Sequence, residues 1–180
     1  MNKKINFKKK DTVLFVIDRD GTLIEDVGFL GLTPDWKNKI VFKNEIIFLL
    51  KALDKIFPKN FKIVVSNQSG VARGFFTEKT LKKINNYIHK KLLLKYKIKI
   101  DVWKYETRVD ENYAKKTKYF FKKEYVSKKT KRKPSPELVV EALKENKLNL
   151  SDFSKIIVIG DRNEDQILAK NLNAVFIKTI

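Results

Sequence analysis

Apolar residues follow two alternating patterns along the chain. One pattern is a short, nearly continuous apolar run, typical of a strand buried on both faces of a parallel sheet; it occurs at residues 13–17, 61–65, 156–159 and 174–177. Residues 98–103, in which apolar and polar residues alternate, also predict a strand. The other is a stripe with helical spacing, which occurs at residues 44–56, 77–94, 136–146 and 164–171. Strands that alternate with helices are typical of repeated βαβ units. We therefore predict an α/β fold with a mostly parallel, five-stranded sheet and right-handed crossovers.

Residues that favour helix ends support these boundaries. Asn44 is a candidate N-cap for the first helix, and Pro58 follows the end of that helix. Thr77 is a candidate N-cap for the second helix, because its hydroxyl can accept a hydrogen bond from a free backbone N–H. Pro136 stands in the first turn of the third helix, where its missing N–H costs nothing.

Two basic segments interrupt or precede the alternating pattern. Residues 105–133 are rich in Lys, Tyr and Phe and lack clear periodicity. A connection of roughly 12–15 residues is already uncommon in a compact domain, so we expect a long basic loop that is either functional or partly mobile. Residues 1–10 are expected to form a basic N-terminal tail.

Length and charge limit the kinds of protein this can be. A chain of 180 residues with 43% hydrophobic residues fits one domain over residues 1–180, which we expect to be a monomer. The net charge of +19 is typical of proteins that bind nucleic acid or membranes. However, only five of the 40 basic residues are arginines, the residue that recognises phosphates and bases with two parallel hydrogen bonds. We therefore interpret the excess mainly as a lysine-rich, solvated surface, and expect neither nucleic acid nor a membrane as partner.

The apolar run at residues 13–17 bears on cellular location. It is shorter than the roughly 7–15 residues of a signal-peptide core and the ~18 or more of a membrane span. We therefore expect a cytoplasmic protein.

The absence of cysteine removes several chemistries. Without Cys the chain has no thiol nucleophile, no disulfide, no iron–sulfur cluster and no cysteine-built zinc site. The one histidine, His89, lies in a helical segment, where we interpret it as a surface or packing residue. Catalysis by this chain would therefore rely on carboxylates, lysine, hydroxyl groups and a hard metal ion.

Acidic and polar residues collect directly after the predicted strands. Asp18 and Asp20 follow the first strand, Ser66 and Asn67 follow the second, and the acidic segment 160–165 follows the fourth. Open parallel sheets bind ligands beyond the carboxyl ends of their strands. Converging carboxylates repel one another unless a hard cation binds them, and an all-oxygen ligand set suits Mg²⁺. Hydroxyl, amide and ammonium donors, the last from Lys133, could hold a phosphoryl group beside such an ion.

These segments resemble the four motifs of the haloacid dehalogenase (HAD) superfamily, and they occur in the same order. The matching residues are Asp18-x-Asp20-Gly21-Thr22, Ser66, Lys133 and Gly160-Asp161-x-x-x-Asp165. The resemblance implies a HAD-like Rossmannoid three-layer sandwich. It also implies a Mg²⁺-dependent phosphatase that forms an aspartyl-phosphate intermediate.

The resemblance also implies a role for each motif residue. Asp18 would attack phosphorus, and Asp20 would protonate the leaving alkoxide and then activate water. Asp18, the Asp20 carbonyl and Asp161 would hold Mg²⁺, with Asp165 orienting the site rather than binding the ion. We expect a crowded acidic site to supply the proton that Asp20 needs at neutral pH, by raising one carboxyl pKa. The residues expected to contact the transferring phosphate are Ser66, Asn67 and Lys133.

Within the superfamily, residues 66–78 and 132–136 are most similar to a group of small phosphatases that act on heptose bisphosphates or histidinol phosphate. That similarity implies a minimal cap or none. The segments 72–74 and 26–29 favour a heptose 1,7-bisphosphate substrate, with histidinol phosphate or a polynucleotide 3′-phosphate as alternatives. A non-catalytic binding protein on the same fold is a further alternative. The implied substrate contacts are Asp26, Val27, Gly28, Phe29, Gln68, Ser69, Arg73, Arg132 and Arg162.

One departure from that group concerns metal binding. Its members usually carry a Cys/His zinc site with Cys-x-Cys just before the Arg-Lys-Pro motif, whereas this chain has Lys129-Thr130-Lys131 there. We therefore expect Mg²⁺ and no zinc. Structural zinc contributes folding energy, so residues 105–133 must be held by packing or be mobile.

Overall fold

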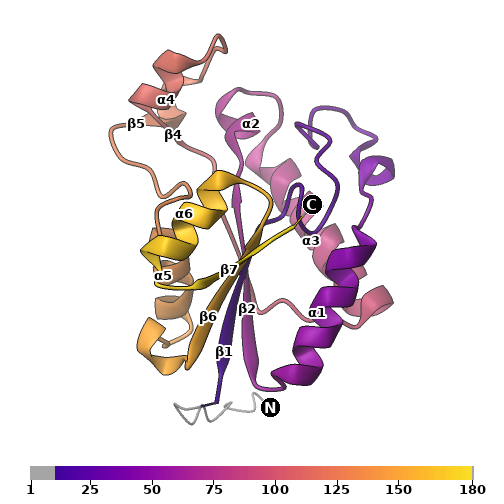
Figure 1. Cartoon of the computed structure of the whole chain (residues 1–180). Coiled ribbons are helices and arrows are strands. Elements are labelled where there is room, and N and C mark those ends of the chain that lie inside the picture. The colour runs from indigo at the N-terminus through magenta and orange to yellow at the C-terminus, as the bar shows by residue number, and fades with distance from the viewer. Residues whose placement is uncertain (1–10, 180) are drawn as a thin grey trace.

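A five-stranded parallel sheet forms the centre of the protein. The computed structural model describes residues 11–179, and the expected basic tail at residues 1–10 lies outside the described residues. The strands follow one another in the order β3-β2-β1-β6-β7 (Figure 1), and all neighbours in this sheet are parallel. Their bounds are β1 (Val13–Ile17), β2 (Asn60–Asn67), β3 (Val102–Glu106), β6 (Lys155–Gly160) and β7 (Val175–Lys178). The predicted α/β class with a parallel five-stranded sheet is confirmed.

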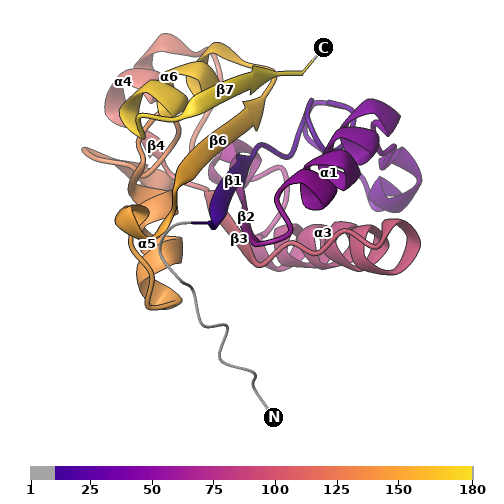
Figure 2. The ribbon, with the colours of Figure 1, turned by 60° about the horizontal axis from the view of Figure 1, so that its bottom comes forward.

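Helices cover both faces of the sheet and give it three layers. Helices α1 (Asn44–Ile56) and α3 (Glu78–Lys91) lie on one face, and α5 (Glu137–Glu145) and α6 (Asn163–Asn171) lie on the other (Figure 2). The central strand β1 serves both layers, because successive side chains of a strand point to opposite faces. Phe15 belongs to the core cluster with α1 and α3, whereas Leu14 belongs to the cluster with α5 and α6.

The register of the strands explains why the polar motifs meet. Ile17, the last residue of β1, is opposite Val64 of β2 and Ile159 of β6. The residues that follow these positions therefore emerge at the same edge of the sheet, which is the carboxyl edge. The predicted convergence of the strand-end motifs follows from this parallel alignment.

The helix ends agree with the sequence to within one residue, except that α3 ends at Lys91 rather than at residue 94. The Thr77 side chain accepts a hydrogen bond from the Thr80 N–H at 3.1 Å, which confirms Thr77 as the N-cap of α3. Asn44 is the first residue of α1 rather than its cap, and Lys43 occupies the cap position. The chain continues after α3 through a π-helical turn, Leu92–Tyr96. No helix in residues 11–179 is both long enough and apolar enough to cross a membrane.

The third predicted strand was placed wrongly. We expected residues 98–103, but β3 begins at Val102. Ile98 and Ile100 are buried in the core before the strand begins, so their alternation reflects packing rather than strand pairing. Asp101 marks the transition, because its N–H donates to the Lys62 carbonyl and its carboxylate accepts from the Lys62 N–H at 2.9 Å.

The segment 105–133 is folded rather than an irregular loop. It contains the two-residue strands β4 (Val109–Asp110) and β5 (Val126–Ser127), which pair in parallel, and helix α4 (Glu111–Lys116). Val109 and Phe121 pack against Ala72, which belongs to the short helix α2 (Ser69–Ala72). Of the two alternatives, packing rather than mobility describes this segment. Figure 1 shows it beyond the carboxyl edge of the sheet, where it forms one wall above the strand ends.

A core substitution tests the placement of β1. The Leu14 side chain is completely buried in β1. Leu14→Ala should lower the free energy of unfolding by about 3 kcal/mol, because it removes apolar contacts and leaves a cavity. Urea denaturation followed by circular dichroism measures this loss. The control is Leu94→Ala, at a leucine that is 68% exposed, where the change should be within about 0.5 kcal/mol; equal losses in both variants would contradict the buried position of Leu14.

Candidate active site

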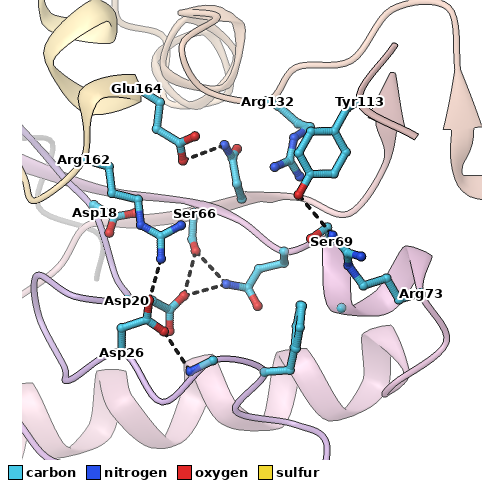
Figure 3. Close-up of a pocket in the computed structure, with 15 residues that line it drawn as sticks. Asp18, Asp20, Asp26, Ser66, Ser69, Arg73, Tyr113, Arg132, Arg162 and Glu164 are labelled. Atoms are coloured by element: carbon cyan, nitrogen blue, oxygen red, sulfur yellow. Dashed lines mark hydrogen bonds and ion pairs between the residues drawn. The ribbon is translucent and has the colours of Figure 1, made fainter. Parts of the chain in front are cut away.

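A pocket lies at the carboxyl edge of the sheet, where the strand-end motifs meet (Figure 3). Residues predicted from sequence form most of its lining: Asp18, Asp20, Asp26, Gly28, Phe29, Ser66, Asn67, Gln68, Ser69, Arg73, Arg132 and Arg162. Gly70, Tyr113 and Glu164 also line it and were not predicted. Val27 is absent from the lining and is 44% exposed. The structure therefore brings together nearly all the predicted substrate contacts, with Val27 outside.

Lys133 lies beneath the pocket between two buried carboxylates. Its Nζ donates to Asp18 Oδ1 and, at 2.6 Å, to Asp165 Oδ1. Burial alone would lower the pKa of Lys133, but the two neighbouring carboxylates outweigh burial and raise its pKa above the usual value. Lys133 therefore stays a cation, and it orients the Asp18 carboxylate.

The negative charge of the buried Asp18 carboxylate is only partly compensated by Lys133. Burial raises the pKa of Asp18 to about 7; Lys133 opposes this shift, while the nearby Asp165 and Asp20 add to it. Such a shift means that the ionised form of Asp18 is short of positive charge. A cation bound beside Asp18 would supply that charge.

The acidic cluster fits a hard divalent cation. One carboxylate oxygen from each of Asp18, Asp161 and Asp165 lies within 4.8 Å of the others. Gly21 allows the backbone after Asp20 to approach this cluster, since a Cβ at Gly21 would lie 2.3 Å from Asp161 Oδ2. An all-oxygen set of this kind suits Mg²⁺, which keeps part of its water shell. Asp165 already accepts from Lys133 and from the Arg162 N–H at 3.1 Å, which is consistent with the orienting role predicted for it.

Asp20 is held by hydrogen-bond donors. Arg19 donates to the Asp20 carboxylate from Nε and Nη2 at 3.1 and 3.0 Å. The Gln68 amide and the Ser66 hydroxyl also donate to it, at 2.7 and 3.3 Å. We expected a crowded acidic site; the neighbouring carboxylates do contribute to the raised pKa of Asp18, but burial is its main cause. Arg19 itself is buried and donates to Asn85 at 2.7 Å; only its place inside the Asp18-Arg19-Asp20 motif could have pointed to this role.

Asn67 connects three parts of the site. Its side-chain amide donates to the Lys133 carbonyl at 3.1 Å, and its Oδ1 accepts from the Lys133 N–H at 2.9 Å. The same amide donates to Glu164 Oε1 at 3.1 Å. These bonds fix the backbone that carries Lys133. Contact between Asn67 and a phosphate stays a prediction.

Two arginines lie at the opposite side of the pocket without an acidic partner. Neither Arg73 nor Arg132 forms an ion pair with a carboxylate of residues 11–179. Arg73 is 8% exposed, and its Nε and Nη1, like Nη1 of Arg132, are buried without a hydrogen-bond partner. Burying a guanidinium without an anion is costly. Both arginines are therefore suited to bind an anionic ligand in the pocket.

Arg162 differs from these two arginines. It pairs with Asp26 at 2.5 Å, and both side chains remain partly exposed at the pocket (Figure 3). The pair joins the segment after β1 to the N-terminal end of α6. It closes one side of the pocket with charges that already compensate each other.

Comparison with known sequences finds relatives of one kind. No protein-family model matches the sequence. A protein of Haemophilus ducreyi is 30% identical over 155 residues, which cover 86% of this chain and 75% of that protein. A protein of Pasteurella multocida is 30% identical over 166 residues, covering 91% and 80%; one of Helicobacter pylori J99 is 27% identical, covering 86% and 75%. All three are named D-glycero-beta-D-manno-heptose-1,7-bisphosphate 7-phosphatase.

Solved structures share the fold. The D,D-heptose 1,7-bisphosphate phosphatase of B. bronchiseptica, in complex with magnesium and phosphate, has a TM-score of 0.66 and 20% identity. The match covers 91% of this chain and 78% of that one. A protein of Mesorhizobium loti described as HAD-like has a TM-score of 0.65 and 24% identity, covering 93% and 71%. The predicted HAD-like fold is confirmed.

Removal of the buried ammonium tests the charge balance of the site. Lys133→Met should lower the free energy of unfolding by about 3 kcal/mol or more at neutral pH, because it leaves Asp18 and Asp165 without their cation. Urea denaturation in metal-free buffer measures the loss.

The matched control for this loss is Lys131→Met. Lys131 forms a half-exposed ion pair with Glu141, whose removal should cost about 1 kcal/mol or less. A Lys133→Met variant as stable as this control would contradict the structural role of Lys133.

Proposed function

This chain belongs to the family of D-glycero-D-manno-heptose-1,7-bisphosphate 7-phosphatases, and we propose that it removes one phosphate from a heptose 1,7-bisphosphate. Its class as a Mg²⁺-dependent phosphoric monoester hydrolase rests on the named phosphatases among its relatives and on the similar structure with magnesium and phosphate. The identity of the substrate, by contrast, must be argued from the pocket of this chain.

The unpaired arginines support a substrate with two phosphates. In this proposal the reacting phosphate binds beside Asp18, whose carboxylate is held by the buried Lys133. Arg73 and Arg132 line the same pocket and have buried donors without partners. Guanidinium groups bind phosphate through parallel, charge-assisted hydrogen bonds. A second phosphate on the same sugar would satisfy these donors while the first lies at Asp18.

The reaction that we propose has two steps. A carboxylate oxygen of Asp18 attacks phosphorus, the bond from phosphorus to the sugar oxygen breaks, and Asp20 gives that oxygen its proton. Asp20 then takes a proton from water, whose oxygen attacks the aspartyl phosphate and releases inorganic phosphate. This restores both carboxyl groups. Arg19 holds Asp20 in place, and Lys133 holds Asp18 in place.

Magnesium would be held by Asp18, Asp161 and the Asp20 carbonyl. It supplies positive charge that compensates the carboxylates and polarises the phosphoryl oxygens. Ser66, Asn67 and Lys133 provide hydroxyl, amide and ammonium groups around the same position and would donate to the transferring phosphate.

The alternative functions fit the pocket less well. Histidinol phosphate has a single phosphate and a cationic amine, so it would leave two arginines unsatisfied and place like charges together. A non-catalytic protein would gain nothing from the buried set of Asp18, Lys133 and Asp165, whose burial costs free energy. A polynucleotide 3′-phosphate has several anionic groups, and the test below therefore includes it.

A substrate panel tests this proposal. In the presence of Mg²⁺, the protein should release phosphate from heptose 1,7-bisphosphate with a kcat/KM at least about tenfold above that for histidinol phosphate, because the arginines bind the second phosphate. A chelator should abolish the release. The panel also contains a 3′-phosphorylated oligonucleotide. Equal or faster release from histidinol phosphate or from the oligonucleotide would exclude the heptose bisphosphate as the preferred substrate.

Substitution of the nucleophile tests the mechanism. Asp18→Asn should reduce phosphate release by about a thousandfold or more, because the amide cannot form the aspartyl phosphate. Asp11→Asn is the matched control, since Asp11 is exposed and pairs only loosely with Lys59 at 3.7 Å. Phosphate release comparable to that of the control would refute covalent catalysis by Asp18.

A further inference from the structure

Tyr113 contacts both unpaired arginines. It belongs to α4, within the segment 105–133, and lines the pocket (Figure 3). Its hydroxyl accepts a hydrogen bond from Arg73 Nη2 at 3.1 Å. The Arg132 guanidinium lies over its ring, 4.8 Å from the centroid. One side chain thus joins two arginines that come from different parts of the chain.

The backbone of Tyr113 is fixed by its own helix cap. Asp110 precedes α4, and its side chain accepts a hydrogen bond from the Tyr113 N–H at 2.8 Å. Asp110 is held in turn by strand pairing with Ser127. The Lys122 N–H donates to the Ala72 carbonyl at 2.8 Å, which attaches this segment to the residue that precedes Arg73. Tyr113 is therefore presented to the pocket by a docked structure.

Aromatic rings surround the Arg73 guanidinium. It lies 4.0 Å from the ring centroid of Tyr119, 4.6 Å from that of Phe121 and 5.3 Å from that of Phe29. Contacts of this kind attract a cation but offer no hydrogen-bond acceptor to its N–H groups. The bond to the Tyr113 hydroxyl uses Nη2 and leaves Nε and Nη1 without a partner. The rings and this single bond therefore fix the orientation of Arg73 while leaving donors for a ligand.

We propose that Tyr113 is a positioning residue that determines specificity: it holds Arg73 and Arg132 together in the arrangement that binds the second phosphate of the substrate. This inference rests on the proposed function. Tyr113 acts through the arginines, with its hydroxyl on Arg73 and its ring on Arg132. The segment 105–133 thereby sets the preference for a bisphosphate.

The test compares binding of heptose 1,7-bisphosphate with binding of heptose 7-phosphate, which lacks the second phosphate. Dissociation constants are measured by calorimetry with Mg²⁺ in the Asp18→Asn background, so that the ligand is not hydrolysed. Tyr113→Phe removes the hydroxyl and keeps the ring. It should reduce the preference for the bisphosphate by about fivefold, the value of one hydrogen bond to a fixed donor.

A second variant separates the ring from the hydroxyl. Tyr113→Leu also removes the stacking on Arg132 and should reduce the preference by about a further fivefold. Tyr125→Phe is the matched control: Tyr125 lies in the same segment, but its hydroxyl donates to Glu78 at 3.3 Å and it does not line the pocket. The preference of Tyr125→Phe for the bisphosphate should equal that of the Asp18→Asn protein without a further substitution.

The binding preferences of the two Tyr113 variants decide whether Tyr113 determines specificity. A reduced preference in both Tyr113 variants supports it. Equal weakening of both ligands, or an unchanged preference in Tyr113→Phe, overturns it and leaves Tyr113 with a purely structural role. Failure of the proposed function would be seen elsewhere, as the absence of phosphate release from heptose 1,7-bisphosphate by the parent protein with Asp18 intact.

Discussion

The buried contact of Lys133 with Asp18 and Asp165 is the constraint on which the site depends. Three charged groups from distant parts of the chain are withdrawn from water, and each is tolerable only while the others are present. The contact therefore joins the end of β1, the start of α6 and the segment before α5. Asn67 adds the end of β2 by hydrogen-bonding the Lys133 backbone. The contact thus holds together the strand and helix ends that carry the acidic groups of the site.

The fold and the convergence of the strand-end side chains could be predicted because both follow from simple regularities. Continuous apolar runs identify buried strands, and parallel strands place their carboxyl ends at one edge, so Asp18, Ser66 and Asp161 had to lie close together. The start of β3 escaped prediction because burial and strand pairing leave the same alternation in a sequence. Ile98 and Ile100 are buried without joining the sheet.

Other parts of the site could not be read from local sequence. Helix α4 has six residues and strands β4 and β5 have two each, which is too short for a periodic pattern to emerge. Tyr113 reaches the pocket through tertiary packing, and nothing in its neighbouring residues marks it. Glu164 stands inside the acidic segment 160–165, but the motif did not identify it as a pocket residue. Arg19 was visible inside a motif, but its contact with Asp20 depends on side-chain geometry. The basic composition also did not predict which cations line the pocket. Three of the few arginines, Arg73, Arg132 and Arg162, line it, whereas no lysine of residues 11–179 does.

The wall formed by residues 105–133 is held without any group that is sensitive to thiol chemistry. One short strand pair stabilises it internally, and apolar packing on Ala72 and hydrogen bonds, including the one from Lys122 to Ala72, attach it to the core. The chain has no cysteine, so this wall has no thiolate that peroxide or disulfide exchange could attack. Oxidation or reduction of cysteine therefore cannot alter the shape of this wall or of the pocket beside it.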